Sequence, residues 1–306
     1  TYFLGSAQSF SRGDGLTNRL DALLVAQDPA GQARLVAFPP AFPLLLGTLG
    51  GDNTARAYLA MACLAIAALV ALTLLLDTTA SKAGTLGRCA QAAAVFGFAS
   101  LFANSAFRPE PVSILIALVW TAGARGIPSS ARRERLLGAL TGVAAHVQVP
   151  LALYGVLAWL AIASRDARWP ELAKRTLQFG AAMTAGVAAG ALFHPYGALV
   201  YGRAFLAFSS SVISMNHIET WTSYWVFGVR YPGLIFPIVL AVLLATGRAR
   251  RVWRSWATPL VFFTAVALAA ILVVRNTWLM PSRWYEAAMF MPFVYLALIR
   301  WTADDT

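Results

Sequence analysis

Residues 57–76 read AYLAMACLAIAALVALTLLL, a stretch without a single charged side chain. A helix needs about 20 mostly apolar residues to cross the hydrocarbon core of a bilayer. A second stretch of the same kind, SWATPLVFFTAVALAAILVV, covers 255–274. Further apolar segments occur at 89–107, 109–124, 136–164, 176–193, 231–247 and 284–299. The sequence therefore predicts an all-α polytopic membrane protein.

Basic residues occupy every second gap between these apolar segments. The gaps that hold them are 77–88, 125–135, 165–175 and 247–254, followed by the tail from Arg300, and together they contain more than half of the 24 Lys and Arg residues. Short loops rich in Lys and Arg face the cytoplasm. The loops that contain Arg132 and Arg250 are therefore predicted to be cytoplasmic. Glu110, His194 and Arg283 are predicted to lie on the outer side.

The composition supports membrane insertion independently of the segments. The chain is 59% hydrophobic and only 12% charged, whereas soluble domains carry about 25% charged residues. The net charge of +11 lies in short loops that would meet anionic lipid headgroups, so it does not indicate a nucleic-acid partner. Cys63 and Cys89 fall in or beside apolar segments, and we expect them to be small core residues rather than a disulfide.

The segment 136–164 is too long for one span and has Pro150 at its middle. Alternation of the basic gaps requires it to cross out and back, so we predict two short helices hinged near Pro150. This gives nine spans in the sequence. The segment before the first span must lie outside, which leads us to expect one further helix before Thr1, with TYFLGSAQSF as its trailing end.

The first outer loop is expected to be 1–56, followed by a transmembrane domain over 57–306 with a second large outer element at 194–230. Within the first loop, Leu16, Leu20, Leu23 and Leu24 recur at helical spacing and predict an amphipathic helix lying in the membrane interface. The run FPPAFPLLLGTLGG (38–51) predicts a short interfacial or re-entrant helix opened by its prolines.

Acidic residues are few, and position decides which of them could be functional. Those in the predicted cytoplasmic loops are expected to be solvated charges; they are Asp77, Glu134, Asp166, Glu171, Asp304 and Asp305. Two outer carboxylates are candidates for catalysis. Asp14 lies in SRGDG (11–15) and could instead be a helix N-cap. Glu110 lies in the tight turn Arg108-Pro109-Glu110-Pro111 and could instead form a local ion pair or favour the helix N-terminus.

Arg283, in PSRWYE (281–286), stands at the entrance of the last span. It is either an interfacial anchor or a ligand for a lipid phosphate, which guanidinium binds bidentately, and Arg108 is a second candidate for that task. His146 and His194 lack metal-ligand spacing, and a lone histidine is more often structural. A divalent metal is not indicated, and Walker, GxSxG and GxGxxG motifs are missing from the sequence.

Taken in order along the chain, these features resemble the GT-C glycosyltransferases of the protein O-mannosyltransferase and aminoarabinose-transferase kind. Asp14 takes the place of the carboxylate in the first outer loop, where many members carry a second acidic residue instead of Gly15. The stretch FPPAFPLLL (38–46) is similar to the family's interfacial "PPLYPLLLAL" segment. The turn at 108–111 resembles the second outer loop. GALTGVAAHVQVPLAL (138–153) resembles the family's hairpin, and His194-Pro195-Tyr196 resembles the motif that opens its large outer loop.

The resemblance implies inverting transfer of a sugar from a polyprenyl-phosphate donor to an acceptor on the outer, periplasmic side of a bacterial inner (plasma) membrane. It implies Asp14 and Glu110 as catalytic carboxylates and Arg283 or Arg108 as ligands of the lipid phosphate. His146, His194 and Tyr196 would line the substrate. The donor lipid would be the substrate, and the resemblance implies no separate cofactor.

Two alternatives belong to other classes. A non-catalytic structural subunit of a membrane assembly would need no decisive motif, and its partners would be other membrane-complex subunits. A secondary transporter or flippase would need charged or broken segments at the middle of the membrane. The predicted spans are almost free of charge and the ionisable residues gather at the outer rim, which favours an interfacial site in contact with membrane lipids and the lipid-linked donor.

Overall fold

The computed structural model describes residues 2–18, 34–35, 39–82, 84–104, 107–166 and 169–214. The regular elements in these ranges are helices: α1 (Tyr2–Ser11), α3 (Ala41–Gly50), α4 (Thr54–Ala80), α5 (Gly84–Asn104), α6 (Glu110–Gly126), α7 (Ala131–Ala144), α8 (Val149–Asp166), α9 (Trp169–Leu192) and α10 (Ala198–Ser214). The only β-type pairing among them is an isolated bridge between Thr17 and Arg34. The predicted all-α class is confirmed for this part of the chain.

Six of the predicted spans correspond to α4 through α9. Only α4 is both long and apolar enough to cross a bilayer among the described helices, over Thr54–Asp77. Just 22% of the most apolar stretch of this helix is buried inside the protein, whereas the core helix of a soluble protein is mostly buried. The segments predicted at 231–247, 255–274 and 284–299 lie outside the described residues, so the count of nine spans stays a prediction.

The two helices predicted in 136–164 are confirmed, and their crossing of the membrane stays a prediction. Helix α7 ends at Ala144 and α8 begins at Val149, and His146 and Gln148 lie in the break between them. Pro150 falls in the first turn of α8, where its missing N–H leaves no hydrogen bond unmade. Helix α7 begins earlier than the apolar segment, because the Ser130 hydroxyl accepts a hydrogen bond from the Arg133 main-chain N–H at 3.1 Å and caps the helix.

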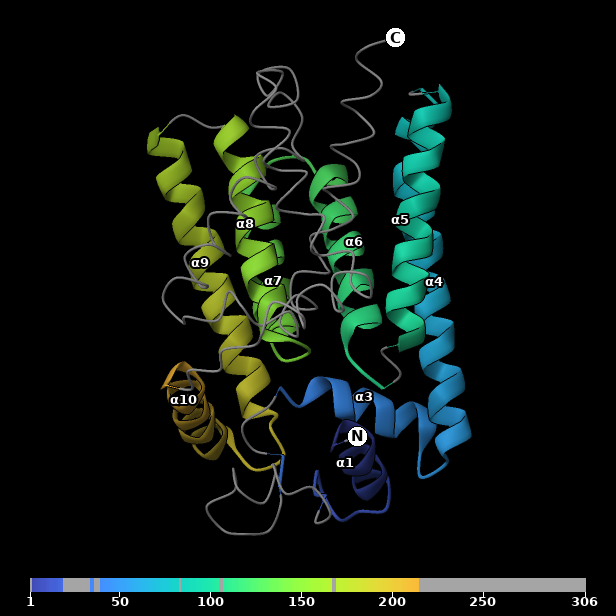
Figure 1. The fold of residues 1–306 in the computed structure, drawn as a ribbon. Helices are drawn as coiled ribbons and strands as arrows, with labels where there is room; N and C mark the ends of the chain where they lie inside the picture. The colour runs from blue at the N-terminus through green and yellow to red at the C-terminus, as the bar shows by residue number, and fades with distance from the viewer. Residues whose placement is uncertain are drawn as a thin grey trace.

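The helices α4 to α9 run up and down alternately, and α1, α3 and α10 lie at one end of them (Figure 1). We call this end the α3 end. The connections α3–α4, α5–α6, α7–α8 and α9–α10 are located there. Helices α4, α6 and α8 end, and α5, α7 and α9 begin, at the opposite end of the molecule, within the three basic gaps at 77–88, 125–135 and 165–175. We call this second end the basic end.

Helices α7 and α9 make the most intimate helix pair. A side chain at Gly138 or Gly142 of α7 would collide with the main-chain oxygens of Phe179 and Met183, respectively, and Gly186 of α9 faces Gly142. Gly138 and Gly142 form a GxxxG pair on α7, and a second such pair begins at Gly186 on α9. Small residues at this spacing let two helix backbones approach closely, as they do in membrane helix pairs.

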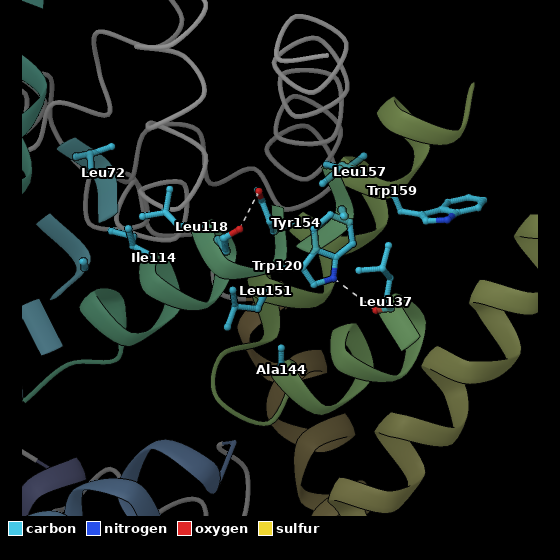
Figure 2. Close-up of a cluster of buried hydrophobic side chains, with 14 of the residues drawn as sticks. Leu72, Ile114, Leu118, Trp120, Leu137, Ala144, Leu151, Tyr154, Leu157 and Trp159 are labelled. Atoms are coloured by element: carbon cyan, nitrogen blue, oxygen red, sulfur yellow. Dashed lines mark hydrogen bonds between the residues drawn. The ribbon is translucent and has the colours of Figure 1, made fainter. Parts of the chain in front are cut away.

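The largest core cluster joins α4, α5, α6, α7, α8 and α9, and Figure 2 shows part of it. Its polar atoms are paired. The indole N–H of Trp120 donates to the Thr141 hydroxyl at 3.1 Å and to the Leu137 carbonyl at 3.4 Å. The Tyr154 hydroxyl is hydrogen-bonded to the Thr121 hydroxyl. These bonds satisfy the polar ends of large side chains whose rings provide the apolar contact area.

The prediction that Glu134 is a solvated charge is wrong. Its side chain is completely buried near the basic end, where it pairs with Arg133 at 2.9 Å and with Arg175 at 2.8 Å. The indole N–H of Trp159 also donates to it. Burial would raise the pKa of Glu134, but the hydrogen bonds from Trp159 and Arg133 and the two guanidinium charges outweigh it and lower the pKa. Glu134 and its partners therefore form a buried charged network that links α7, α8 and α9.

The cysteine prediction is also corrected. Cys63 on α4 and Cys89 on α5 are exposed thiols rather than core residues. Exposed apolar side chains accompany Cys63 along α4: Tyr58, Leu59, Ile66, Val70 and Leu74. The outer surface of α4 is therefore apolar from Tyr58 to Leu74.

Candidate functional site

Segments distant in sequence meet at the α3 end. Ala7 of α1, Phe42 and Leu46 of α3, Met61 of α4 and Val112 of α6 belong to one buried cluster. A smaller cluster is formed by two fully buried leucines, with Tyr196 packed against them; the leucines are Leu16 and Leu35. The α7–α8 connection joins this assembly through the main-chain oxygen of His146, which accepts a hydrogen bond from the first residue of α3, Ala41, at 2.9 Å.

Asp14 lies in the turn that follows α1. Its main-chain N–H closes this turn on the Ser9 carbonyl at 3.0 Å, and Gly13 supplies the positive φ of 87° that the turn requires. The carboxylate is 64% exposed and its Oδ2 lies 3.8 Å from the Arg12 Nε. Residues 15–18 are not helical, so Asp14 does not cap a helix that starts directly after it.

Gly15 places the Asp14 turn beside Tyr196. A Cβ atom built on Gly15 would lie 2.9 Å from the Tyr196 hydroxyl, and φ of this glycine is +73°. The guanidinium carbon of Arg34 stands 5.2 Å from the centroid of the same tyrosine ring, a cation–π distance. An acidic residue in place of Gly15 would therefore be strained and crowded. Sequence reasoning missed Arg34, because nothing in the sequence indicates its partner.

Glu110 has a different environment. It opens α6 after Pro109, its side chain is 2% exposed, and Arg108 contacts its Oε1 through Nε and Nη2, both at 3.0 Å. Phe107 before it has φ of 60°, an uncommon value for a non-glycine residue that turns the chain sharply into the helix. A buried carboxylate held by a guanidinium at a helix N-terminus is stabilised as an anion. This suits a positioning role better than proton uptake from a solvated acceptor.

One hydrogen bond links the Glu110 turn to the histidine-bearing connection. The hydroxyl of Ser113, one turn after Glu110 on α6, donates to the Gln148 side-chain oxygen at 2.6 Å, and both groups are buried. Gln148 is two residues from His146. The α6 start is thus fixed against the α7–α8 connection by a specific polar contact. Neither Gln148 nor Ser113 carries a signal in the sequence that indicates this contact.

His146 and His194 come together around Tyr201 of α10. The His194 and Tyr201 rings stack with centroids 4.6 Å apart, and the His146 ring centroid is 5.8 Å from that of Tyr201. Tyr196 is the fourth ring, 5.9 Å from His194. Gly190 leaves the space that the His146 ring fills, because any side chain there would collide with it. We call His146, His194, Tyr196 and Tyr201 the imidazole–tyrosine cluster.

The cluster keeps His194 neutral. Burial, with a smaller contribution from the charge of His146, lowers the pKa of His194 from 6.5 to about 4. Its Nδ1 accepts a hydrogen bond from the Tyr196 main-chain N–H at 3.2 Å. The Nε2 of His146 donates to the Val187 carbonyl at 2.9 Å. Both rings are therefore held in fixed orientations by main-chain partners.

The structure thus gathers three of the predicted site residues and gives two others different surroundings. His146, His194 and Tyr196 form one cluster, and Asp14 lies in the turn whose Gly15 touches it. Glu110 is buried and paired with Arg108, while Asp14 is exposed. Arg283 lies outside the described residues. In the described ranges, no three His, Cys, Asp or Glu side chains gather as metal ligands.

The chain matches no protein-family model, no curated protein and no solved structure.

Proposed function

We propose that this protein is a membrane glycosyltransferase that moves a sugar from a polyprenyl-phosphate donor to an acceptor at the α3 end, on the outer side of the membrane. The observation that carries this proposal is the gathering of the Asp14 turn, the His146 connection and the His194–Tyr196 turn at the end opposite the basic loops. These are the segments in which the resemblance to GT-C glycosyltransferases resides.

Three features support the membrane setting. Basic gaps gather at the end that the positive-inside rule assigns to the cytoplasm. The apolar side chains of α4 point outward, and a large exposed apolar surface on a protein marks a membrane or a partner. The α7–α9 pair uses glycine contacts of the kind that hold membrane helices together without a hydrophobic driving force.

We propose Asp14 as the general base. It is exposed, so an acceptor hydroxyl from the aqueous side can reach it, and its ion pair with Arg12 is itself exposed to solvent and therefore weak. Glu110 and Arg108 hold one another and fix the start of α6. In the transfer, the acceptor O–H proton passes to Asp14 while the acceptor oxygen bonds to the anomeric carbon. The bond from that carbon to the phosphate oxygen breaks, and polyprenyl phosphate leaves with its electron pair.

The leaving phosphate needs cationic stabilisation more than protonation, because it is already a good leaving group. We propose Arg283 for this contact, as a guanidinium can bind phosphate through two parallel hydrogen bonds. Arg108 is less suited to it, because its Nε and Nη2 are both engaged with Glu110.

The proposal is tested with the full chain in proteoliposomes and a panel of polyprenyl-phospho-hexoses labelled in the sugar. We expect labelled sugar to leave the lipid in the presence of a peptide or glycolipid acceptor extract, and D14N to abolish this release while the protein stays folded. The control is D52N, since Asp52 is another exposed carboxylate at the α3 end. Absence of release from every donor, or equal release by D14N, contradicts the proposal.

A further inference from the structure

Two buried nitrogen atoms in the imidazole–tyrosine cluster make no hydrogen bond to the described residues. His146 and His194 are each 4% exposed. One nitrogen of each ring is bonded to the main chain, as described above. The other, Nδ1 of His146 and Nε2 of His194, is enclosed and has no hydrogen-bond partner in the part of the chain that the structure describes. Buried polar atoms are nearly always hydrogen-bonded, so such a pair calls for an explanation.

The main-chain bonds determine which kind of partner each atom needs. A carbonyl can only accept, so the Nε2 of His146 carries its proton toward Val187, and in the neutral ring Nδ1 is left with a lone pair. A main-chain N–H can only donate, so the Nδ1 of His194 is the acceptor and its Nε2 carries the proton. One ring therefore offers an acceptor and the other a donor.

We infer that His146 Nδ1 and His194 Nε2 form a subsite for hydroxyl groups of a carbohydrate. A hydroxyl both donates and accepts hydrogen bonds, so the hydroxyls of a sugar can supply the donor that one nitrogen needs and the acceptor that the other needs. The two rings share Tyr201 as a neighbour, which keeps them within one small region. The inference rests on the proposed function and names what this cluster contributes to it, namely recognition of the sugar.

The surroundings fit a sugar ring. Tyr196 and Tyr201 place aromatic rings beside the two imidazoles, and apolar surroundings with a few fixed polar groups are typical of small-molecule sites. Gly15 lies against Tyr196 and brings the Asp14 turn next to the cluster. Both nitrogens are enclosed, so binding of a hydroxyl requires a local rearrangement, and the turn between α9 and α10, which carries His194 and Tyr196, is the segment that would have to open. Gly197 in that turn has a positive φ of 82° with open space around its α-carbon.

Paired variants distinguish the role of the nitrogen without a partner from the role of the nitrogen that is hydrogen-bonded to the main chain, for each ring in turn. A glutamine amide reaches the position of Nε2 and an asparagine oxygen reaches that of Nδ1. H146Q keeps the donor to Val187 and loses the Nδ1 acceptor, and H194N keeps the acceptor for Tyr196 and loses the Nε2 donor. H146N and H194Q are the matched controls, because each loses the main-chain bond and keeps the atom that would face the sugar.

The probe is a set of methyl hexopyranosides of manno, gluco and galacto configuration, measured by saturation-transfer difference NMR on the full chain in detergent. We expect at least one to bind the wild type. H146Q and H194N should weaken that binding about tenfold, the effect of one lost hydrogen bond, with unfolding temperatures unchanged. H146N and H194Q should instead lower the unfolding temperature and keep the binding of the folded fraction.

Binding of no hexoside by the folded wild type, or binding that H146Q and H194N leave unchanged, overturns the inference, since the nitrogens would then face only trapped water. The lipid-linked transfer assay is read separately. Sugar release that persists without hexoside binding removes the subsite and leaves the glycosyltransferase in place. Hexoside binding that depends on both nitrogens, without any release, supports the subsite and contradicts the proposed function.

Discussion

The imidazole of His194 is buried between Tyr196 and Tyr201, and its pKa in the folded chain is about 4, against about 6.5 in an unfolded one. Between these values the unfolded chain binds more protons, so the free energy of unfolding rises with pH. The stabilisation is present above pH 6.5 and is lost as the pH falls toward 4. Its size is at most about 3 kcal/mol.

This linkage predicts a smaller acid sensitivity in H194N. Unfolding temperatures of wild type and H194N are compared at pH 7.5 and 4.5, in the same detergent. We expect the wild type to lose more stability between the two pH values, because only it must expel a proton from position 194 to fold. Equal losses in the two proteins would show that His194 is not the group responsible.

Glu134 is the second residue whose burial makes a sharp prediction. Replacement by Gln leaves the Arg133 and Arg175 guanidiniums buried without a carboxylate, and breaking such a pair costs roughly 3–5 kcal/mol. E134Q should unfold at a clearly lower temperature than the wild type. E171Q is the control, since Glu171 is an exposed carboxylate in the first turn of α9. Equal unfolding temperatures for E134Q and E171Q would show that the buried charges do not depend on one another.

At the scale of elements, the contact of α7 with α9 depends on glycine. A methyl group at Gly142 would meet the Met183 carbonyl oxygen and the Val187 main-chain nitrogen, which cannot move without shifting α9. G142A should therefore destabilise by about 1–3 kcal/mol, as overpacking does. Gly180 on α9 has open space around its α-carbon, so G180A should be neutral or slightly stabilising through helix propensity. Similar unfolding temperatures for the two variants would contradict this packing.

The elements themselves were largely predictable, because apolar length and prolines act locally. The break near Pro150, the short helix after Pro40 and the helices of the apolar segments followed from the sequence. The contacts between elements did not. Glu134 reads as a loop charge until Trp159 and Arg175 are known to face it. Arg34 and Tyr201 have no signal at all, since their partners come from segments far away in the chain.

In the candidate site too, the individual residues were predictable from the sequence and the contacts between them were not. His146, His194 and Tyr196 were singled out one by one through motif resemblance, and only the packing of the α7–α8 connection against α9 and α10 puts them together. From the sequence alone, Asp14 and Glu110 were both candidate catalytic carboxylates. The fold distinguishes them by burial, exposing one at 64% and enclosing the other at 2%. Burial of a turn residue depends on which helices cover it, and this is not encoded locally.

At the scale of the whole molecule, α1, α3 and α10 lie at one end of the helices and the basic gaps lie at the other. Ser11 is exposed beside Asp14 at the α3 end, and Lys82 is exposed in the α4–α5 connection at the basic end. If the basic end is cytoplasmic, the turn with Asp14 faces the medium outside the cell. Cys63 and Cys89 are exposed and must first be replaced by Ser so that they do not react.

Labelling of S11C and K82C in intact cells with a membrane-impermeant maleimide determines which end of the protein faces the medium, and the proposed chemistry requires this to be the α3 end. We expect S11C to be labelled in intact cells, whereas K82C is labelled only after the membrane is opened. R250C, in a further predicted cytoplasmic loop, should behave like K82C. Labelling of K82C or R250C from outside, with S11C protected, would mean that the orientation is the reverse of the proposed one. If none of the protein is found in the membrane fraction and all three variants are labelled equally in opened cells, the proposal of a membrane protein is wrong.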